Sequence, residues 1–460
     1  MKRTSALFLV LCSISCAART DPATQPQGAA AGISETSVRS HMEFLASDAM
    51  NGRASGSRDE WIAATYVAAR LRRIGLEPLG DQGGYVQTIE VERPELGSPP
   101  VLTIGDRRFM HAQELTVVSM PTPKISGALS RHQKGTPAAR GAVVLISEPL
   151  APIAAELSAA AIVLTRPDGC GPQTTASRAR LPRPAARTIG TPPPASRPAC
   201  VSLDAPTFDT VDKIAPGTTA TLEADVKTVQ KTNTWNAIGR LVGSDPQMSH
   251  EVILLSAHID HVGTRANAPP GTDAINNGAD DDASGSIAVL ELAEAIARGP
   301  RPKRTIVFAW FGSEETGGTG SRFFADKPVV PLDRIVANLQ FEMIGRPDAK
   351  VPPHTLWLTG YERSNLGPEL AKRGAKLVQD PHPDQSFFTR SDNIQFARRG
   401  VIAHTVSSYG LHKEYHTPAD DISKIDFAHM TDAIRSMVEP VRWLANAPFR
   451  PAWKPGGRPQ

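Results

Sequence analysis

Side chains that can bind a metal ion gather in one half of this chain. In chain order they are His258, Asp260, Asp281, Glu314, Glu315, Glu342 and His416. His258 stands just after the apolar run 252–255, which predicts a buried strand, and Asp281 stands just before the apolar-periodic segment 287–296, which predicts a helix. Because sites in α/β sheets are built where strands end and helices begin, we expect these side chains to meet at one edge of a sheet.

The residue types suit zinc in particular. Imidazole and carboxylate groups bind zinc where thiolates are absent, and a catalytic zinc keeps one position open for water. Two zinc ions that share one carboxylate need about two histidines and three acids. The chain offers His258, Asp281, Glu315, Glu342 and His416. Adjacent acids on a loop can divide two roles, one binding the metal and one acting as general base, and Glu314 with Glu315 has that form.

Each of these pieces has a plainer explanation when it is taken alone. A histidine at the end of a strand is more often structural than a ligand, and a pair of glutamates is commonly a solvated surface. An acidic triplet such as 280–282 often only stabilises the N-terminus of a helix. Five such pieces in one α/β region are much less easily explained by chance, so the sequence predicts a metal site.

Strands and helices alternate through the same half. Strands are predicted at 236–242, 251–257, 304–311, 335–343, 355–359 and 400–406, and helices at 283–298, 318–326 and 364–374. A last helix has an apolar face that runs from Phe427 to Leu444. Two helices are also predicted within 34–75, and a strand at 87–91. This pattern predicts an α/β fold with a mainly parallel sheet flanked by helices.

The middle of the chain has a different character. Residues 100–225 alternate short apolar runs with clusters of proline, arginine and glycine, which predicts a small β-rich domain inserted into the α/β domain. The α/β domain would then consist of 34–99 and 226–446, followed by a loose tail at 447–460. The net charge of +3 over 460 residues gives no reason to expect a nucleic-acid partner.

The N-terminus has the form of an export signal. Lys2 and Arg3 precede a short apolar core and a group of small residues, which predicts a signal peptide at 1–18 and a linker at 19–33. Cys16 is a candidate for a lipid anchor, and simple cleavage after Ala17 or Ala18 is the alternative. The protein would be exported to the periplasm or cell envelope or secreted, and no second apolar run is long enough to span a bilayer.

Two cysteines lie outside this signal. Cys170 and Cys200 both fall in the proline-rich middle of the chain. In an exported protein such a pair is more often a disulfide than a metal site, so we predict a disulfide, with two free thiols as the alternative.

Taken together, the motifs resemble those of the aminopeptidase Y type of zinc peptidases, a family that includes bacterial leucyl aminopeptidases, glutamate carboxypeptidase II and glutaminyl cyclases. The matching segments are 258–260, 278–285, 312–315, 343–345 and 416–420, with weaker matches at 51–53 and 75–78. The likeness extends over about 233–445 and, as a set, is specific. The insertion at 100–225 would correspond to the family's protease-associated domain, although the sequence match there is faint.

The resemblance implies a role for each candidate. His258 would bind the first zinc, and Asp281 would bridge both ions. Glu315 and His416 would bind the second zinc. Glu314 would be the general base of metal-assisted peptide hydrolysis, and Asp260 would orient His258 from behind.

The chain departs from the family pattern at two positions. Glu342 stands where the family has aspartate, and it is assigned to the first zinc. The plainer alternative is that it only lies nearby and that water completes the coordination. Asn393 follows Ser391 and Asp392 where the family has histidine.

Three functions are compatible with these residues. The first is an exported aminopeptidase that acts on peptides. The second is a carboxypeptidase, dipeptidase or glutaminyl cyclase on the same scaffold. The third is a binding protein without metal, which is disfavoured because every ligand position is occupied by a competent residue. The sequence cannot place Arg265, Arg390, Arg398 or Arg399 in a substrate pocket, and it leaves the oligomeric state open.

Overall fold

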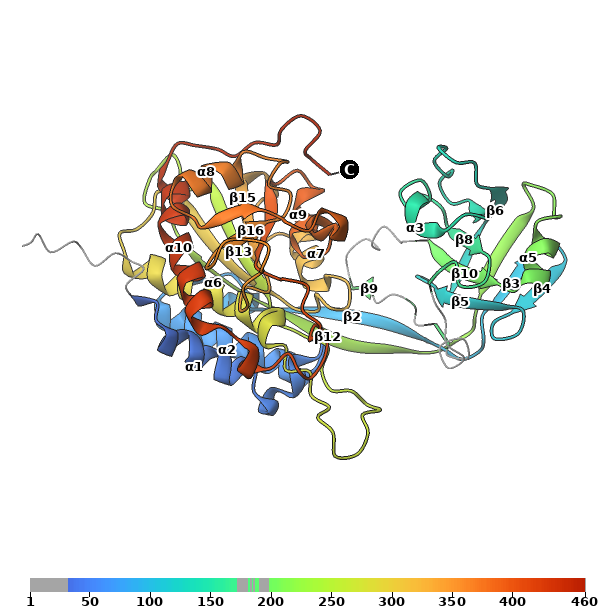
Figure 1. Ribbon diagram of the computed structural model, residues 1–460, viewed down its shortest axis with the longest axis horizontal. Helices are drawn as coiled ribbons and strands as arrows, with labels where there is room; N and C mark the ends of the chain where they lie inside the picture. The colour runs from blue at the N-terminus through green and yellow to red at the C-terminus, as the bar shows by residue number, and fades with distance from the viewer. Residues whose placement is uncertain (1–31, 172–180, 183, 185–186, 190–197, 460) are drawn as a thin grey trace, which may run out of the picture.

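The computed structural model describes residues 32–171, 181–182, 184, 187–189 and 198–459. It contains two bodies, which lie at opposite ends of the long paired strands β2 and β12 (Figure 1). We call them the α/β body, formed by residues 33–96, 187–189 and 226–459, and the inserted body, formed by the other described residues of 101–223. The predicted signal peptide, Cys16 and most of the predicted linker lie outside the described residues.

The sheet of the α/β body has ten strands, in the order β17-β16-β18-β15-β13-β14-β12-β2-β9, and β1 pairs with β12. Their bounds are β1 Glu77–Pro78, β2 Val86–Leu96, β9 Arg187–Thr188, β12 Val226–Leu241, β13 Val252–His258, β14 Thr305–Phe311, β15 Ile335–Phe341, β16 Leu356–Leu358, β17 Leu377–Gln379 and β18 Ala403–Ser407.

The centre of this sheet is parallel. Strands β14, β13, β15 and β18 run in one direction, and β12 and β16 border them in the antiparallel sense. Every residue of β13, β14 and β15 is buried, as expected for parallel strands covered on both faces. The predicted parallel sheet is therefore found where the candidate ligands lie, while the outer strands make the whole sheet mixed.

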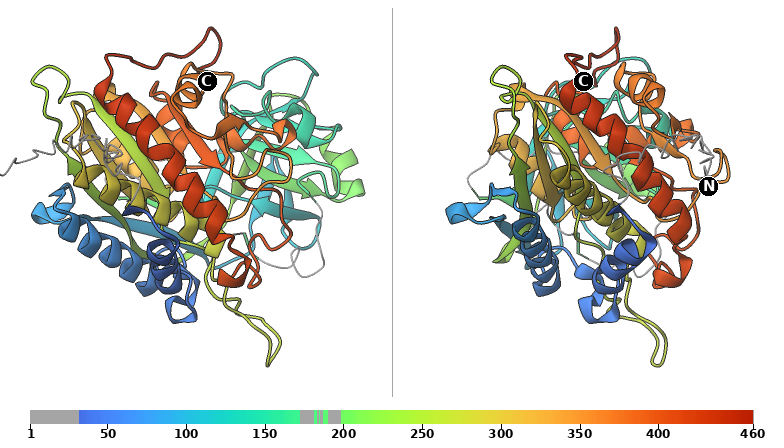
Figure 2. Two further views of the ribbon diagram at one scale, coloured as in Figure 1. Left: turned by 60° about the vertical axis from the view of Figure 1, so that its left-hand side comes forward. Right: turned by 90° about the vertical axis from the view of Figure 1, so that its left-hand side faces the viewer.

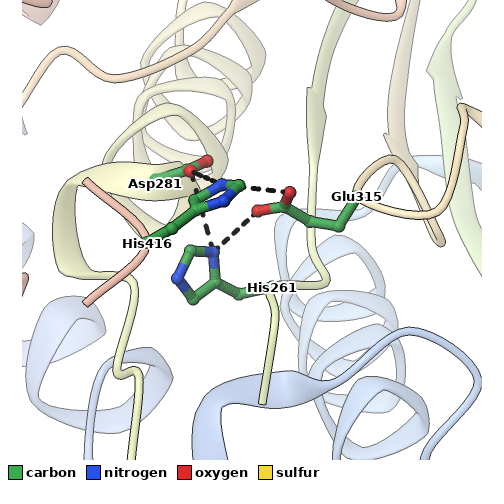
Figure 3. A group of neighbouring side chains, drawn as sticks. All are labelled: His261, Asp281, Glu315 and His416. Atoms are coloured by element: carbon green, nitrogen blue, oxygen red, sulfur yellow. Dashed lines mark hydrogen bonds and ion pairs between the residues drawn. The ribbon is translucent and has the colours of Figure 1, made fainter. Parts of the chain in front are cut away.

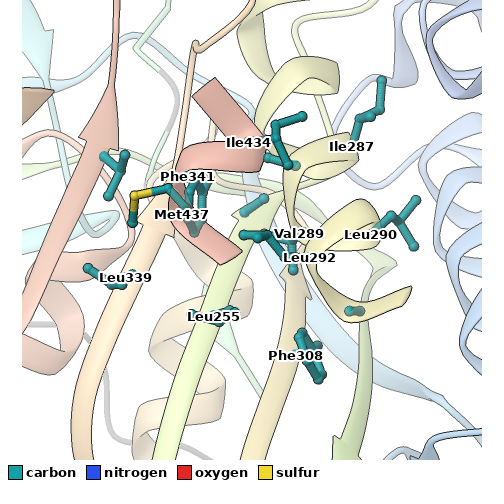
Figure 4. Packing of buried hydrophobic residues seen from close by; sticks show 14 of the residues in the cluster. Leu255, Ile287, Val289, Leu290, Leu292, Phe308, Leu339, Phe341, Ile434 and Met437 are labelled. Atoms are coloured by element: carbon teal, nitrogen blue, oxygen red, sulfur yellow. The ribbon is translucent and has the colours of Figure 1, made fainter. Parts of the chain in front are cut away.

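Helices cover both faces of the sheet (Figure 2). Their bounds are α1 Glu35–Leu45, α2 Arg58–Ile74, α6 Gly285–Arg298, α7 Thr319–Asp326, α8 Leu366–Lys372, α9 Asn393–Ala397 and α10 Phe427–Asn446. On one face Leu255 and Phe308 pack with α6 and α10, as Figure 4 shows. The neighbouring residues Leu254 and Val307 point to the other face, where they join a cluster with α7 and α9. This alternation follows from the two-residue period of a strand.

The inserted body has an eight-stranded sheet in the order β4-β3-β11-β6-β7-β8-β10-β5. Its elements are β3 Val101–Ile104, β4 Arg107–Met110, β5 Leu115–Ser119, β6 Lys124–Arg131, β7 Val143–Leu145, β8 Ile162–Thr165, β10 Ala199–Leu203, β11 Thr219–Glu223, α3 Leu150–Ile153 and α5 Ala205–Val211. Leu102, Leu164 and Phe208 belong to a hydrophobic core of its own. Cys170 and Cys200 form a disulfide, which confirms the predicted pairing.

The tail is not loose, contrary to the expectation from its prolines and glycines. Trp453 forms a β-bridge with Ser364, and its Nε1–H donates a hydrogen bond to the carbonyl oxygen of Gly400 at 3.2 Å. Its ring also packs against Phe388 and His404. Partial burial of this large ring attaches the tail to the body, so its prolines and glycines lie close to an anchored point. None of the helices in the described part of the chain is both long and apolar enough to cross a membrane.

Candidate metal centre

The parallel strands bring the predicted ligands to one edge of the sheet. His258 is the last residue of β13, Glu342 directly follows β15, and Glu315 lies in the loop after β14. Asp281 lies in the short helical segment η4 Ala279–Ser284, which leads into α6. His416 lies in the loop after β18. The expectation that these segments share one edge is confirmed by the strand pairing.

Four side chains converge closely. One ligand atom from each of His261, Asp281, Glu315 and His416 lies within 4.8 Å of the others (Figure 3). The Nε2 atom of His416 is 3.0 Å from Oδ2 of Asp281 and 3.1 Å from Oε2 of Glu315. The Nδ1 atom of His261 is 2.8 Å from Oε1 of Glu315 and 3.8 Å from Oδ2 of Asp281. We call these residues the four-residue group.

His258 lies beside the other carboxylate oxygen of Asp281. Its Nε2 atom lies 3.3 Å from Oδ1 of Asp281, and its Nδ1–H donates to the backbone oxygen of Asp260 at 3.2 Å. Asp281 therefore stands between two sets of imidazoles, with His258 at Oδ1 and the other two histidines at Oδ2. This is the arrangement that a bridging carboxylate requires.

The carboxylates of the other two members of the acidic triplet accept hydrogen bonds from backbone N–H groups. Asp282 accepts hydrogen bonds from the backbone N–H of His258 at 3.2 Å and of Gly285 at 3.0 Å. Asp280 accepts from the N–H of Gly345 at 2.8 Å and lies 3.0 Å from Nε2 of His412. Their carboxylates are thus occupied by other contacts, and that of Asp281 is the one turned toward His258, His261 and His416. The peptide bond between Asp281 and Asp282 is cis.

Asp260 joins the loop of His258 to the loop of the two glutamates. Its Oδ1 accepts a hydrogen bond from the N–H of Glu314 at 2.9 Å, and its Oδ2 accepts from the N–H of Glu315 at 3.3 Å and from the hydroxyl of Ser55 at 2.5 Å. The same Oδ1 is 3.6 Å from Nδ1 of His258. Asp260 therefore fixes two of the loops that carry predicted functional groups.

Glu342 lies outside the four-residue group. Its carboxylate accepts a hydrogen bond from the hydroxyl of Ser391. It lines a pocket together with Trp357, Phe387, Arg390, Tyr409 and Tyr415. Of the four arginines whose place the sequence leaves open, Arg390 is among the residues that line this pocket.

Asn393, which replaces the family's histidine, is buried and structural. Its Nδ2 donates to the backbone oxygen of Phe388 at 3.1 Å, and its Oδ1 accepts from the hydroxyl of Thr405 at 3.0 Å. The side chain thus ties the start of α9 to β18.

The centre concentrates negative charge. Burial opposes protonation of His416, but the nearby Asp281 and Glu315 raise its pKa to about 10. Burial raises the pKa of Glu342 to about 8, and burial also raises the pKa of Glu314 well above its usual range. The pKa shifts show how strongly this place favours an added positive charge.

The donor set fits a metal ion. The Nε2 atoms of His258 and His416 are buried and have no hydrogen-bond partner, although carboxylate oxygens lie beside both. A buried polar atom without a partner is costly, and a cation between the imidazoles and carboxylates would remove that cost. Imidazole and carboxylate groups are the ligands that zinc accepts, so the residues fit such an ion.

His261 is the member of the group that the sequence analysis did not predict. The sequence did contain a hint of this ligand, because a second histidine closely follows His258. The direction of the His261 ring depends on a contact with Gly278. A Cβ atom at position 278 would lie 2.6 Å from Cγ of that ring, so the ring can pack there because residue 278 is a glycine. Gly278 has a φ of +59°, a conformation that glycine adopts readily.

The fold and this centre define a class of protein. Residues 236–440 match the model of peptidase family M28, so this part of the chain is similar to the members of that family. The family resemblance inferred from the motifs is thereby confirmed.

Individual relatives agree with this assignment. The chain is 28% identical over 257 residues to leucine aminopeptidase 2 of Trichophyton equinum, covering 49% of this chain and 48% of that protein. It is 34% identical over 116 residues to leupeptin-inactivating enzyme 1 of Streptomyces exfoliatus, covering 25% of this chain and 23% of that protein. The chain thus spans about half the length of the first of these curated relatives and less of the second.

Solved structures show the same fold over most of the chain. An aminopeptidase from Aneurinibacillus sp. strain AM-1 superimposes with a TM-score of 0.55 at 19% identity, covering 92% of this chain and 97% of that one. The zinc aminopeptidase BSAP from Bacillus subtilis superimposes with a TM-score of 0.50 at 20% identity, covering 91% and 97%.

Proposed function

We propose that this protein is an exported two-zinc aminopeptidase that removes residues from the N-termini of peptides. The observation that carries the proposal is the position of Asp281, whose two oxygens face His258 on one side and His261 and His416 on the other. Relatives named aminopeptidases support the activity.

The residues that would hold the metals follow from this geometry and from the family pattern. The first zinc would be held by His258, Asp281 and Glu342, and the second by Asp281, Glu315 and His416. Zinc bound there would supply a Lewis acid for the peptide carbonyl and a water of lowered pKa.

Glu314 would act as the general base. The backbone of Glu314 is fixed by Asp260, and its side chain belongs to the same loop as Glu315. Its carboxylate would take the proton of the attacking water and return it to the leaving amine, which becomes the new N-terminus of the shortened peptide.

Export is supported by two features. Residues 1–18 have the pattern of a signal peptide, and the disulfide between Cys170 and Cys200 suits an oxidising compartment. The proposal of export includes two alternatives for Cys16, which either carries a lipid anchor or is removed with the signal peptide.

Two measurements test the proposed function. Metal analysis after gentle purification is expected to find two zinc ions per chain, and less than about one would favour a binding protein instead. A screen of aminoacyl-anilides against N-acylated dipeptides is expected to show cleavage of the anilides. Cleavage of the N-blocked set alone would contradict the aminopeptidase assignment.

One observation favours a second candidate, a carboxypeptidase or dipeptidase. Arg390 lines the pocket beside Glu342, and its guanidinium lies 5.0 Å from the centre of the Phe387 ring. An arginine in this place could bind a substrate carboxylate. The same substrate screen separates the two candidates.

A further inference from the structure

We infer that His261 is a fourth protein ligand of the second metal. The second metal would then have no coordination position left for water, whereas the first metal, with three protein ligands, would keep one for water or substrate. This inference rests on the proposed function, because it concerns the metals proposed there. It adds a ligand that the family pattern does not supply and gives the two metals different roles.

The first argument is the place of the His261 nitrogen. Its Nδ1 atom lies 3.8 Å from Oδ2 of Asp281, and Nε2 of His416 lies 3.0 Å from the same oxygen and 3.1 Å from Glu315. In a tetrahedral site with zinc bonds of about 2.0–2.1 Å, ligand atoms are about 3.3–3.4 Å apart. The separations of 3.0, 3.1 and 3.8 Å lie on either side of that value, and one ligand atom from each of the four side chains lies within 4.8 Å of the others, close enough for one ion between them.

The second argument is symmetry about Asp281. His258 ends β13 and His261 follows in the next loop, and their nitrogens lie nearest to different oxygens of this carboxylate, Oδ1 at 3.3 Å and Oδ2 at 3.8 Å. The Nδ1 atom of His261 thus lies near both of the carboxylates that neighbour His416, 2.8 Å from Glu315 and 3.8 Å from Asp281. The rings of His261 and His416 lie edge to face, with centroids 5.4 Å apart, and both turn toward the same gap (Figure 3).

The third argument is that the His261 ring is already held in place. The side chain is fully buried and rests against Gly278, and its backbone N–H donates to the carbonyl oxygen of Arg53 at 3.0 Å. Its Nδ1 therefore points at the two carboxylates without any need for rearrangement, which lowers the cost of binding an ion.

The competing explanation is that Nδ1–H only donates a hydrogen bond to Glu315. The 2.8 Å separation of these atoms allows it. The two explanations differ for His261→Asn, because asparagine keeps an N–H donor at a similar reach but offers zinc no imidazole lone pair. A ligand role requires asparagine to behave like alanine, whereas a hydrogen-bonding role requires it to behave like histidine.

The experiment uses the full-length mature protein, stripped with a chelator and reloaded with zinc chloride. Zinc affinity is measured by competition with a chromophoric chelator in the parent protein, His261→Asn, His261→Ala and His416→Asn. We expect one tight and one weaker zinc in the parent. Both His261 variants should lose at least about 100-fold in affinity at the tight position, more than the usual effect of a residue behind a ligand.

X-ray absorption at the zinc edge gives a second readout that does not depend on turnover. With one equivalent of zinc, the parent should show two imidazoles per zinc and His261→Asn should show one. If His261→Asn keeps the parent affinity, or if the parent shows a single imidazole, the inference is wrong and His261 only orients Glu315. A loss of zinc in His416→Asn, with none in His261→Asn, would leave the proposed function standing and remove only this inference. Failure of the parent to bind zinc would overturn both.

Discussion

Glu342 stands where the peptidase family that this chain resembles has an aspartate. Glutamate is one methylene longer, so its carboxylate must tilt or its backbone must sit back to reach the same ion. The hydrogen bond from Ser391 shows one way of directing that longer arm. The proposed first metal position would therefore depend on a side chain one methylene longer than the aspartate of the family.

If Glu342 is a ligand, Glu342→Ala leaves the first zinc with His258 and Asp281, fewer than the three protein ligands usual for catalytic zinc. We expect this variant to keep about one zinc of two, to fold normally and to lose most activity. Glu342→Asp is the matched control and should keep both metals. Metal analysis with a thermal denaturation curve checks this, and two tightly bound zincs in Glu342→Ala would remove Glu342 from the ligands.

Glu314 gives the sharpest test of mechanism. Glu314→Gln keeps the size of the side chain but cannot accept the proton of the attacking water. We expect kcat to fall at least about 100-fold, the usual scale of general-base catalysis, with an unchanged zinc content. Steady-state kinetics on an aminoacyl-anilide measures this. Turnover close to that of the parent would assign the base to another group.

The sequence predicted the residues of the centre better than their contacts. Residue types and motif spacing identified four of its members, namely His258, Asp281, Glu315 and His416. Their side chains meet because the parallel strands bring these segments to one edge of the sheet. His261 was missed because the sequence does not show that its ring faces inward, as that of His258 does. The ring packs against Gly278, which lies later in the same connection between β13 and α6, and such a contact is not visible in the sequence.

At the scale of elements, the sequence predicted those strands and helices whose buried positions give a clear pattern of apolar residues. The buried strands β13, β14 and β15 and the helix α10 agree closely with their predicted ranges. The first part of β12 was missed, because its residues from Val226 to Thr232 are exposed and carry no apolar pattern. This part is a strand because it pairs with β2, and such pairing cannot be seen in one segment alone.

The neutral histidine His404 holds β18 to the loop after β16. Its Nδ1–H donates to the carbonyl of Thr359 at 2.7 Å, and Nε2 lies 2.8 Å from the hydroxyl of Ser364. Burial lowers its pKa from 6.5 to about 4, with the hydrogen bond to Thr359 opposing and Arg363 assisting that shift. The unfolded chain thus binds a proton at a higher pH than the folded one, so stability falls as the pH drops from 6.5 toward 4.

This single group should account for a loss of about 3 kcal/mol in the free energy of unfolding across that pH window. His404→Asn keeps a donor for Thr359 but does not titrate. Urea denaturation of the two metal-free proteins, measured from pH 7 to pH 4.5, should therefore show a shallower decline for the variant. Parallel curves would mean that His404 does not contribute to acid sensitivity.

At the scale of the whole molecule, the hydrophobic clusters of the described residues fall into two groups, one in each body. The α/β body carries the candidate metal centre, and the inserted body contains none of the predicted ligands. The bodies are joined by β2 and β12, whose exposed stretch includes Val226 and Val229 (Figure 1). Two cores joined by a thin connection are expected to unfold as separate units.

The disulfide offers a way to test this independence. Cys170 and Cys200 are separated by 30 residues in sequence, and closing a loop of that length stabilises a fold by about 3–4 kcal/mol. In the double variant Cys170→Ala/Cys200→Ala, calorimetry should show two transitions, of which only the one belonging to the inserted body moves to lower temperature. Zinc content and turnover of aminoacyl-anilides should equal those of the parent, because the metal centre lies in the other body. A single transition that moves as a whole, or a loss of zinc, would show that the two cores are coupled through β2 and β12.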